Sequence, residues 1–142
     1  MKSVVAQKYA AAAAGEVVAL FRSHRADVPD GGQRRDFVFV DDCVAVVEWL
    51  LANRQVSGLF NVGSGRARSF ADLVEAMFAA LGKPAKIGFV DMPAELRGKY
   101  QYFTEASMEK LRAAGFDRPS TPIEAGVGRY VQDFLTRPDP YR

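Results

Sequence analysis

The sequence is poor in the residues that support redox and metal chemistry. Its 142 residues include one cysteine, Cys43, and one histidine, His24. A single cysteine excludes an intramolecular disulfide and a cysteine-rich metal site, and it fits a reducing compartment. Cys43 lies in an apolar run, where a free cysteine acts more often as a small core residue than as a catalytic thiol.

An excess of charge of one sign is also lacking. Nineteen basic and seventeen acidic side chains give a net charge of +2, which is too balanced for the strong one-sided field that nucleic-acid binding requires. We therefore expect no nucleic-acid partner, whereas a small anionic ligand remains compatible with this composition.

No hydrophobic run is long enough to suggest a targeting or membrane segment. The N-terminal stretch carries Lys2 and Lys8 among its apolar residues, so it is too short and too charged for a signal sequence or a membrane span. With 49% hydrophobic residues, the chain can bury roughly two-thirds of its unfolded surface. These features predict a single domain over residues 1–142, in the cytoplasm and without membrane contact.

The first third of the chain predicts a helix, two strands and a second helix. Residues 1 to 14 have an apolar helical face that begins without a cap, as expected where upstream sequence has been removed, and Gly15 supplies a stop. A strand over residues 16 to 21 and a polar loop over residues 22 to 34 follow. Residues 36 to 40 are rich in β-formers. Asp41 and Asp42 then stand as cap and first-turn acid of a helix that ends near Asn53 and should be deeply buried.

The remainder alternates in the same way. We expect strands over residues 59 to 62 and 86 to 90, and between them a helix capped by Ser69 with Asp72 and ending at Gly82. Residues 92 to 99 suggest an irregular stretch or a short helical turn, and residues 104 to 115 a helix. The last helix is predicted to have Thr121 as its cap, Pro122 in its first turn and Glu124 closing a capping box. Interleaved strands and helices indicate an α/β or α+β protein.

Two motifs can carry function. The glycine pair in LFNVGSGRARSF imitates a dinucleotide-binding turn, but Arg68 replaces the third glycine, so a plain tight turn or a loop beside a ligand pocket are the alternatives. In QRRDFVFVDDC, Arg35 offers a two-pronged donor for a diphosphate. The alternative is a solvated arginine that pairs with Asp36 or Asp41.

Longer segments extend these motifs into a family resemblance. The stretches RDFVFVDDCVAVVEWLL and SGLFNVGSGRARSFADL resemble the C-terminal half of extended short-chain dehydrogenase/reductase enzymes that act on nucleotide sugars. RGKYQYFT, MKSVVAQKY, LRAAGFDRP and TPIEAGVGRYV make the chain similar to the ADP-glycero-manno-heptose 6-epimerases. The resemblance implies the C-terminal part of a Rossmann-type enzyme, with a small mixed sheet, helices, and a missing N-terminal cofactor-binding part.

The resemblance also implies an activity. Such enzymes use NADP to oxidise and re-reduce the sugar at C6″ of an ADP-heptose, which supplies lipopolysaccharide inner-core synthesis. Their acid-base set is a Tyr-x-x-x-Lys pair and a second lysine. Tyr9, Tyr100, Tyr102 and Tyr130 lack a lysine four positions on, so no catalytic residue and no bound NADP are expected in this chain, which should be inactive alone.

The resemblance implies that this chain supplies substrate contacts. They include an arginine for the diphosphate, aromatic rings that can stack, and polar groups that can orient a sugar. Some members carry histidine at the position of Gln7 and Phe-Glu-Gly-Ser at residues 21 to 24, so details of the sugar or adenine contacts can differ. The implied substrate-binding residues are Gln7, Phe21, Arg22, Ser23, His24, Arg35 and Tyr100.

Three hypotheses follow. The chain is a substrate-binding fragment of an epimerase or of another NDP-sugar epimerase or dehydratase, with an ADP-sugar and further copies of itself as partners. Alternatively, it is a stand-alone sugar-nucleotide-binding module without chemistry. The third hypothesis is a small dinucleotide-binding protein that uses Gly63 and Gly65.

Overall fold

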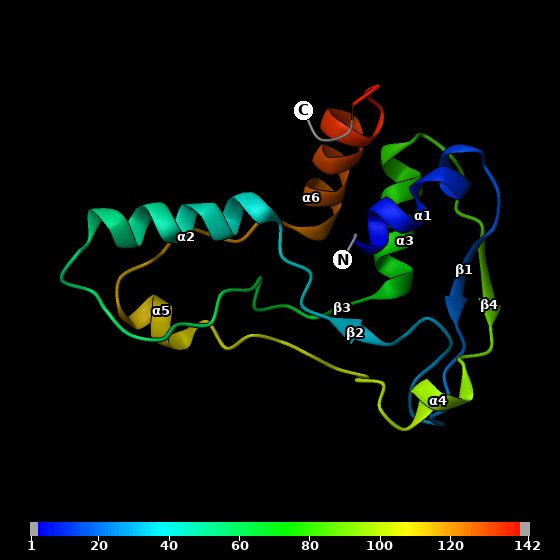
Figure 1. Ribbon diagram of the computed structural model, residues 1–142, viewed down its shortest axis with the longest axis horizontal. Coiled ribbons are helices and arrows are strands. Elements are labelled where there is room, and N and C mark those ends of the chain that lie inside the picture. The colour runs from blue at the N-terminus through cyan, green and yellow to red at the C-terminus, as the bar shows by residue number, and fades with distance from the viewer. Residues whose placement is uncertain (1–2, 140–142) are drawn as a thin grey trace.

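The computed structural model describes residues 3–139 as an elongated α/β molecule (Figure 1). One end holds β1, β4, α1 and α3, the other holds α2 and α5, and the short β2–β3 pair lies between them. The α/β class is confirmed, whereas the single-domain assignment stays a prediction. The elements in chain order are α1 (Val4–Ala13), β1 (Val18–Phe21), β2 (Arg34–Arg35), α2 (Val40–Ala52), β3 (Arg68–Ser69), α3 (Phe70–Ala80), β4 (Ile87–Val90), α4 (Ala94–Arg97), α5 (Glu109–Ala113), α6 (Ile123–Tyr130) and the π-helix η1 (Val131–Leu135).

The strands form two separate pairs. β1 and β4 are parallel, with Val18 opposite Ile87 and Phe21 opposite Val90. β2 and β3 are antiparallel, with Arg34 opposite Ser69. Within residues 3 to 139, parallel and antiparallel pairing are thus divided between two two-stranded sheets.

Helix α3 is the centre of the main hydrophobic core. Its first turn has the predicted capping box: the Asp72 N–H donates to Ser69 Oγ at 3.0 Å, and the Ser69 N–H donates to Asp72 Oδ2 at 3.0 Å. Phe78 and Met77 are fully buried where α3 packs against α1, α6 and η1. The predicted helix and its capping signal are therefore confirmed.

Helix α1 ends as expected but begins differently. Gly15 has a positive φ of 71°, and its N–H donates to the carbonyl of Ala12, which is the glycine stop that the sequence indicated. The predicted absence of a cap is wrong, because Ser3 Oγ accepts the N–H of Ala6 at 3.1 Å. Residues 1 and 2, with which that prediction began, lie outside the described part of the chain.

Two predictions around α2 are wrong. Residues 36 to 39 form no strand, and Phe39 rather than an aspartate is the N-cap, with Asp41 and Asp42 in the first turn. Deep burial is also wrong: Ala45 and Val46 are buried, but Val44, Val47 and Leu51 are 48%, 56% and 66% exposed. The apolar side chains of this helix predict that its surface should be buried, but they do not show which part of the protein buries it.

The buried side of α2 builds a second, smaller cluster. Ala45 and Val46 pack with Leu111 and Phe116, and the Trp49 ring meets Phe116 edge to face at 5.7 Å. This cluster lies at the α2–α5 end of the molecule in Figure 1.

The predicted strand over residues 59 to 62 is not formed. Phe60 and Val62 pack onto the second cluster, while Leu59 is 86% exposed. None of the strand pairs in the described chain includes this segment. Apolar residues alone do not make a strand, because a strand also needs a neighbouring strand to pair with.

Helix α5 is shorter than the predicted helix over residues 104 to 115, and helix α6 is capped differently than predicted. Residues 104 to 107 are not helical, because the N–H groups of Thr104 and Ala106 donate to Arg34 O and to the Asp36 carboxylate. Helix α6 has Pro122 as its N-cap without a side-chain cap. Thr121 instead donates through its N–H and hydroxyl to Asp42, both at 2.8 Å. Tertiary partners have thus taken the groups that the sequence assigned to local caps.

None of the helices between residues 3 and 139 is long and apolar enough to cross a lipid bilayer.

Candidate functional site

Arg35 lies on β2 with its guanidinium between two aromatic rings. Its Cζ is 5.3 Å from the centre of the Tyr100 ring and 5.8 Å from that of Phe70. One guanidinium N–H donates to the carbonyl of Arg34 at 2.8 Å. Within the described residues this cation has no carboxylate partner, so its charge is held in place but not neutralised.

The alternative interpretation of Arg35 as an ion-pair partner does not hold. The Asp36 carboxylate accepts hydrogen bonds from Ser64, Gly65 and Ala106. Asp41 pairs with Arg129 at 3.1 Å. Both carboxylates that were candidates for pairing with Arg35 are engaged elsewhere.

Tyr100 connects Arg35 to the loop after β1. Its ring meets Phe21 edge to face at 6.2 Å and Tyr102 at 5.8 Å. Burial raises the pKa of the Tyr100 hydroxyl above its usual value, against the smaller opposite effect of Arg35. Tyr100 is therefore a neutral phenol at physiological pH, able to donate a hydrogen bond.

The loop that carries Arg22, Ser23 and His24 is held by polar contacts. The Ser23 N–H donates to Asp30 at 2.7 Å, and the His24 N–H donates to the Tyr102 hydroxyl at 2.9 Å. Arg22 pairs with Asp30 at 3.2 Å and with Asp91 at 3.7 Å, so its charge is already partly neutralised. The loop thus contacts Tyr102, whose ring in turn meets the Tyr100 ring beside Arg35.

The structure brings most, but not all, of the predicted residues together. Phe21, Arg35 and Tyr100 are joined by ring contacts, and His24 reaches them through Tyr102. Gln7 is instead exposed on α1, a separate element.

Sequence reasoning missed two residues near the site. The helical period predicts Phe70 only as an apolar position of α3, but in the structure its ring faces Arg35 and meets Phe37 edge to face at 5.4 Å. Gln33 is buried, and its amide donates to the carbonyls of Phe21 and Arg22 at 3.4 and 3.3 Å. The sequence signal for Gln33 was its place directly before the arginine pair in QRRDF, because a glutamine that is buried needs hydrogen-bond partners.

The glycine turn does not fit a dinucleotide phosphate. The N–H groups of Ser64 and Gly65 point at Asp36 Oδ1 and Oδ2, at 2.7 and 3.1 Å, and the Ser64 hydroxyl donates to Oδ1 as well. A Cβ at Gly63 would collide with the same carboxylate and with Ala106. An internal anion therefore occupies the donors that a phosphate would need.

Two further features bear on the type of site. Within residues 3 to 139, no group of three or more His, Cys, Asp or Glu side chains could hold a metal ion. A cavity of about 520 Å³ is lined mainly by apolar side chains of residues 36 to 40, the start of α1 and α6, among them Val5, Phe39 and Val127, and Arg35 is not among its lining residues. It offers little to orient a polar ligand.

Relatives in sequence agree over almost the whole chain. The family model described as "NAD dependent epimerase/dehydratase family" matches residues 1–63. An ADP-L-glycero-D-manno-heptose-6-epimerase of Nitratidesulfovibrio vulgaris (strain DP4) is 50% identical over 141 residues, which cover 99% of this chain and 44% of that protein. The protein of the same name from Fusobacterium nucleatum subsp. nucleatum is 40% identical, with the same coverage. The chain spans less than half the length of these relatives.

Solved structures agree in fold. The ADP-L-glycero-D-manno-heptose-6-epimerase of Helicobacter pylori superposes with a TM-score of 0.74 and 28% identity, over 96% of this chain and 39% of that one. The UDP-glucose 4-epimerase of Thermus thermophilus, solved with NAD, gives 0.69 and 26%, over 88% and 37%. By sequence and fold, this chain is thus similar to proteins of the NAD dependent epimerase/dehydratase family, and it matches under half the length of the ADP-L-glycero-D-manno-heptose-6-epimerases among them.

Proposed function

We propose that the chain is the nucleotide-sugar-binding, C-terminal portion of an ADP-glycero-manno-heptose 6-epimerase. The single observation that carries the proposal is the Arg35 guanidinium, which is held between the Tyr100 and Phe70 rings without a carboxylate partner in the described residues. A fixed and un-neutralised guanidinium fits a diphosphate, because its planar fork makes paired, charge-assisted hydrogen bonds to phosphate oxygens.

The neighbouring side chains supply the remaining contacts of such a site. The rings of Phe21 and Tyr100 offer apolar faces and edges for a base or a sugar, and the neutral Tyr100 hydroxyl can donate to an oxygen. Ser23 and His24 lie on the adjoining loop. Gln7 also belongs to the proposed set, although it lies on α1, outside the contacts that join the other residues. Arg22 is the weakest member, because Asp30 and Asp91 already engage its charge.

The chemistry of the complete enzyme would lie outside this chain. There, NADP would accept and return the hydride during inversion at C6″ of an ADP-heptose, in the cytoplasm and for lipopolysaccharide synthesis. The isolated chain should neither epimerise an ADP-heptose nor bind NADP, because it lacks a Tyr-x-x-x-Lys pair and its glycine turn is filled by Asp36.

A related function for another nucleotide sugar is the alternative. The fold is shared with a UDP-glucose 4-epimerase, and guanidinium–diphosphate bonding does not depend on the base. The base is therefore the variable that an experiment has to test. A stand-alone binding module without chemistry would bind a nucleotide sugar in the same way. The gene sequence immediately upstream would distinguish such a module from a fragment of an epimerase.

Calorimetric titration of the 142-residue chain with ADP-glucose, UDP-glucose and NADP tests the proposal. We expect saturable binding of ADP-glucose that weakens roughly ten- to a hundredfold in Arg35→Ala, since hydrogen bonds to charged groups contribute about 1.5 to 3 kcal/mol. Arg35→Lys should keep part of the affinity as a point charge. Arg54→Ala, an exposed arginine outside the site, is the matched control and should change nothing.

Thermal melts of each variant separate loss of binding from loss of folding. Unchanged affinity in a folded Arg35→Ala would make Arg35 structural and would refute the proposed site. Tighter binding of UDP-glucose than of ADP-glucose would favour the alternative substrate class, and tight NADP binding would revive the dinucleotide-binding hypothesis.

A further inference from the structure

A second cavity, with a more polar lining, borders the glycine turn. Its volume is about 340 Å³, and it is bounded by residues 64 to 66 and Arg68, by the segment that leads into α6 and the first turn of α6, and by Arg112 of α5. Three arginines line it, Arg66, Arg68 and Arg112, together with one carboxylate, Glu124. We call this cavity the arginine cleft. Neither Arg35 nor the two rings beside it, Phe70 and Tyr100, line this cavity.

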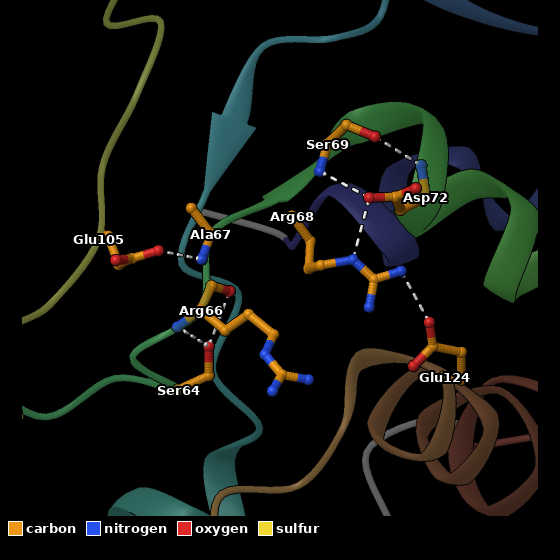
Figure 2. Close-up of polar contacts among 8 residues, drawn as sticks. All are labelled: Ser64, Arg66, Ala67, Arg68, Ser69, Asp72, Glu105 and Glu124. Carbon is orange, nitrogen blue, oxygen red and sulfur yellow. Dashed lines mark hydrogen bonds and ion pairs between the residues drawn. The ribbon is translucent and has the colours of Figure 1, made fainter.

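Arg68 is the neutralised member of the cleft. Its Nε donates to Asp72 at 3.0 Å and an Nη donates to Glu124 at 2.8 Å. These carboxylates raise the already high pKa of the guanidinium, and the pKa values of Asp72 and Glu124 are lowered. Figure 2 shows the Arg68 side chain extended from β3 toward Glu124, with Arg66 reaching to the same side of the turn.

Arg66 and Arg112 keep their charge available. The Arg66 N–H donates to Ser64 Oγ at 3.2 Å, but its guanidinium has no partner among residues 3 to 139. One nitrogen of Arg112 donates to the carbonyls of Phe116 and Arg118, at 2.9 and 2.6 Å. Those bonds fix the position of the guanidinium without cancelling its charge.

The hydroxyl groups of the cleft are already committed. Ser120 donates to the carbonyl of Ser64 at 2.9 Å, Thr121 to Asp42 and Ser64 to Asp36. The remaining side-chain donors are therefore guanidinium N–H groups, and the lining side chains carry three positive charges against one negative charge.

We propose that the arginine cleft binds a small phosphate-type oxyanion through Arg66 and Arg112, as a site separate from the one at Arg35. A tetrahedral oxyanion presents several acceptor oxygens to converging guanidinium forks, and the cavity is large enough for a phosphate or a small phosphate monoester. The negative charge of Glu124 repels an anion, and its ion pair with Arg68 occupies one of the three guanidinium groups. Both effects limit the affinity of the cleft for phosphate.

Titration of the chain with inorganic phosphate at constant ionic strength, followed by ¹H–¹⁵N NMR, tests this proposal. The Arg35→Ala variant is the starting protein, so that binding at that site does not contribute. We expect saturable shifts of the amides of residues 64 to 68 and 119 to 124. Arg66→Gln should weaken binding roughly tenfold, as expected when bonds to a charged partner are lost, and Arg66→Lys should weaken it less.

Two further variants sharpen the result. Glu124→Gln should tighten phosphate binding, because it removes the opposing charge, whereas Arg54→Gln, at an exposed arginine outside the cleft, should leave it unchanged. Phenyl phosphate serves as a monoester probe. Tighter binding of phenyl phosphate indicates a phosphoryl group carried on a small molecule, and equal or weaker binding indicates free phosphate.

Three outcomes would overturn the proposal. They are shifts that do not saturate, a folded Arg66→Gln protein with unchanged affinity, and an equal loss in Arg54→Gln. Each leaves the proposed nucleotide-sugar site untouched, because Arg35 is absent from this experiment.

Discussion

Asp36 is the residue at which three distant segments meet. It follows β2 directly, and its carboxylate accepts N–H groups from Ser64 at 2.7 Å, Gly65 at 3.1 Å and Ala106 at 2.9 Å. The glycine turn and the strand-like segment after Phe103 are thereby tied to the residue next to Arg35. Asp36 therefore holds the glycine turn and residue 106 against the backbone next to Arg35.

Asp36→Asn should destabilise the fold by about 1 to 3 kcal/mol, because an amide loses the charge and presents only one acceptor oxygen to these donors. Urea unfolding measures the change. Asp41→Asn is the matched control, because its pair with Arg129 is about half exposed and such pairs contribute about 0 to 1 kcal/mol. Equal losses in the two variants would contradict the role given to Asp36.

The same carboxylate gives the stability a pH dependence. Burial alone would raise the pKa of Asp36, but the hydrogen bonds from Ser64, Ala106 and Gly65 outweigh burial and lower the pKa. A lowered folded-state pKa means that this contribution is complete above the ordinary aspartate range near pH ~4. It is lost as the pH falls through the lower folded-state value. Asp36→Asn should therefore flatten the acid limb of the stability curve.

Among the elements, α3 has the most local specification. Its capping box, apolar period and glycine stop all lie within residues 69 to 82, and its buried side chains Val74, Met77 and Phe78 form the middle of the main core. Local signals and tertiary packing agree there, which is typical of an element on which others assemble.

Ser69→Ala should cost about 1 kcal/mol of stability, since the orphan N–H of Asp72 loses its acceptor. Thermal unfolding followed by circular dichroism measures the lower midpoint. Ser57→Ala, at an exposed position outside helices and strands, should leave the midpoint unchanged. A Ser69→Ala midpoint equal to that of the original chain would show that the cap contributes nothing.

Helix α2 behaves differently from α3. Only its Ala45–Val46 side is covered, by α5 and the chain that follows it, while Val40, Val44, Val47 and Leu51 stand exposed at spacings of four, three and four residues. This spacing is that of a helix–helix seam. These four exposed side chains therefore form an uncovered apolar stripe along α2.

At the scale of the whole molecule, this stripe should drive self-association of the isolated chain. Apolar surface removed from water favours association, so we predict a concentration-dependent oligomer that Val47→Glu with Leu51→Glu dissociates. Analytical ultracentrifugation measures the mass. Leu59→Glu, at an exposed leucine outside α2, is the control. A monomer at all concentrations would refute the prediction.

Much of this architecture follows from the sequence alone. The α/β class, β1, β4, the capping box of α3 and the glycine stops of α1 and α3 depend on residues close together in the chain, so their physics is local. The family resemblance likewise rests on contiguous motifs. It placed Phe21, Arg35 and Tyr100 in one site, and the structure brings these three side chains together.

Only the tertiary structure decided the remaining features. They depend on which of several distant groups forms a hydrogen bond or a contact with a given residue. Thr121 donates to Asp42 instead of capping α6, Asp36 fills the glycine turn that a phosphate could have used, and residues 59 to 62 have no strand edge beside them. Apolar content predicted that α2 needs a cover but not which face receives one. A sequence specifies donors, acceptors and apolar area, and only the folded chain shows how they are paired.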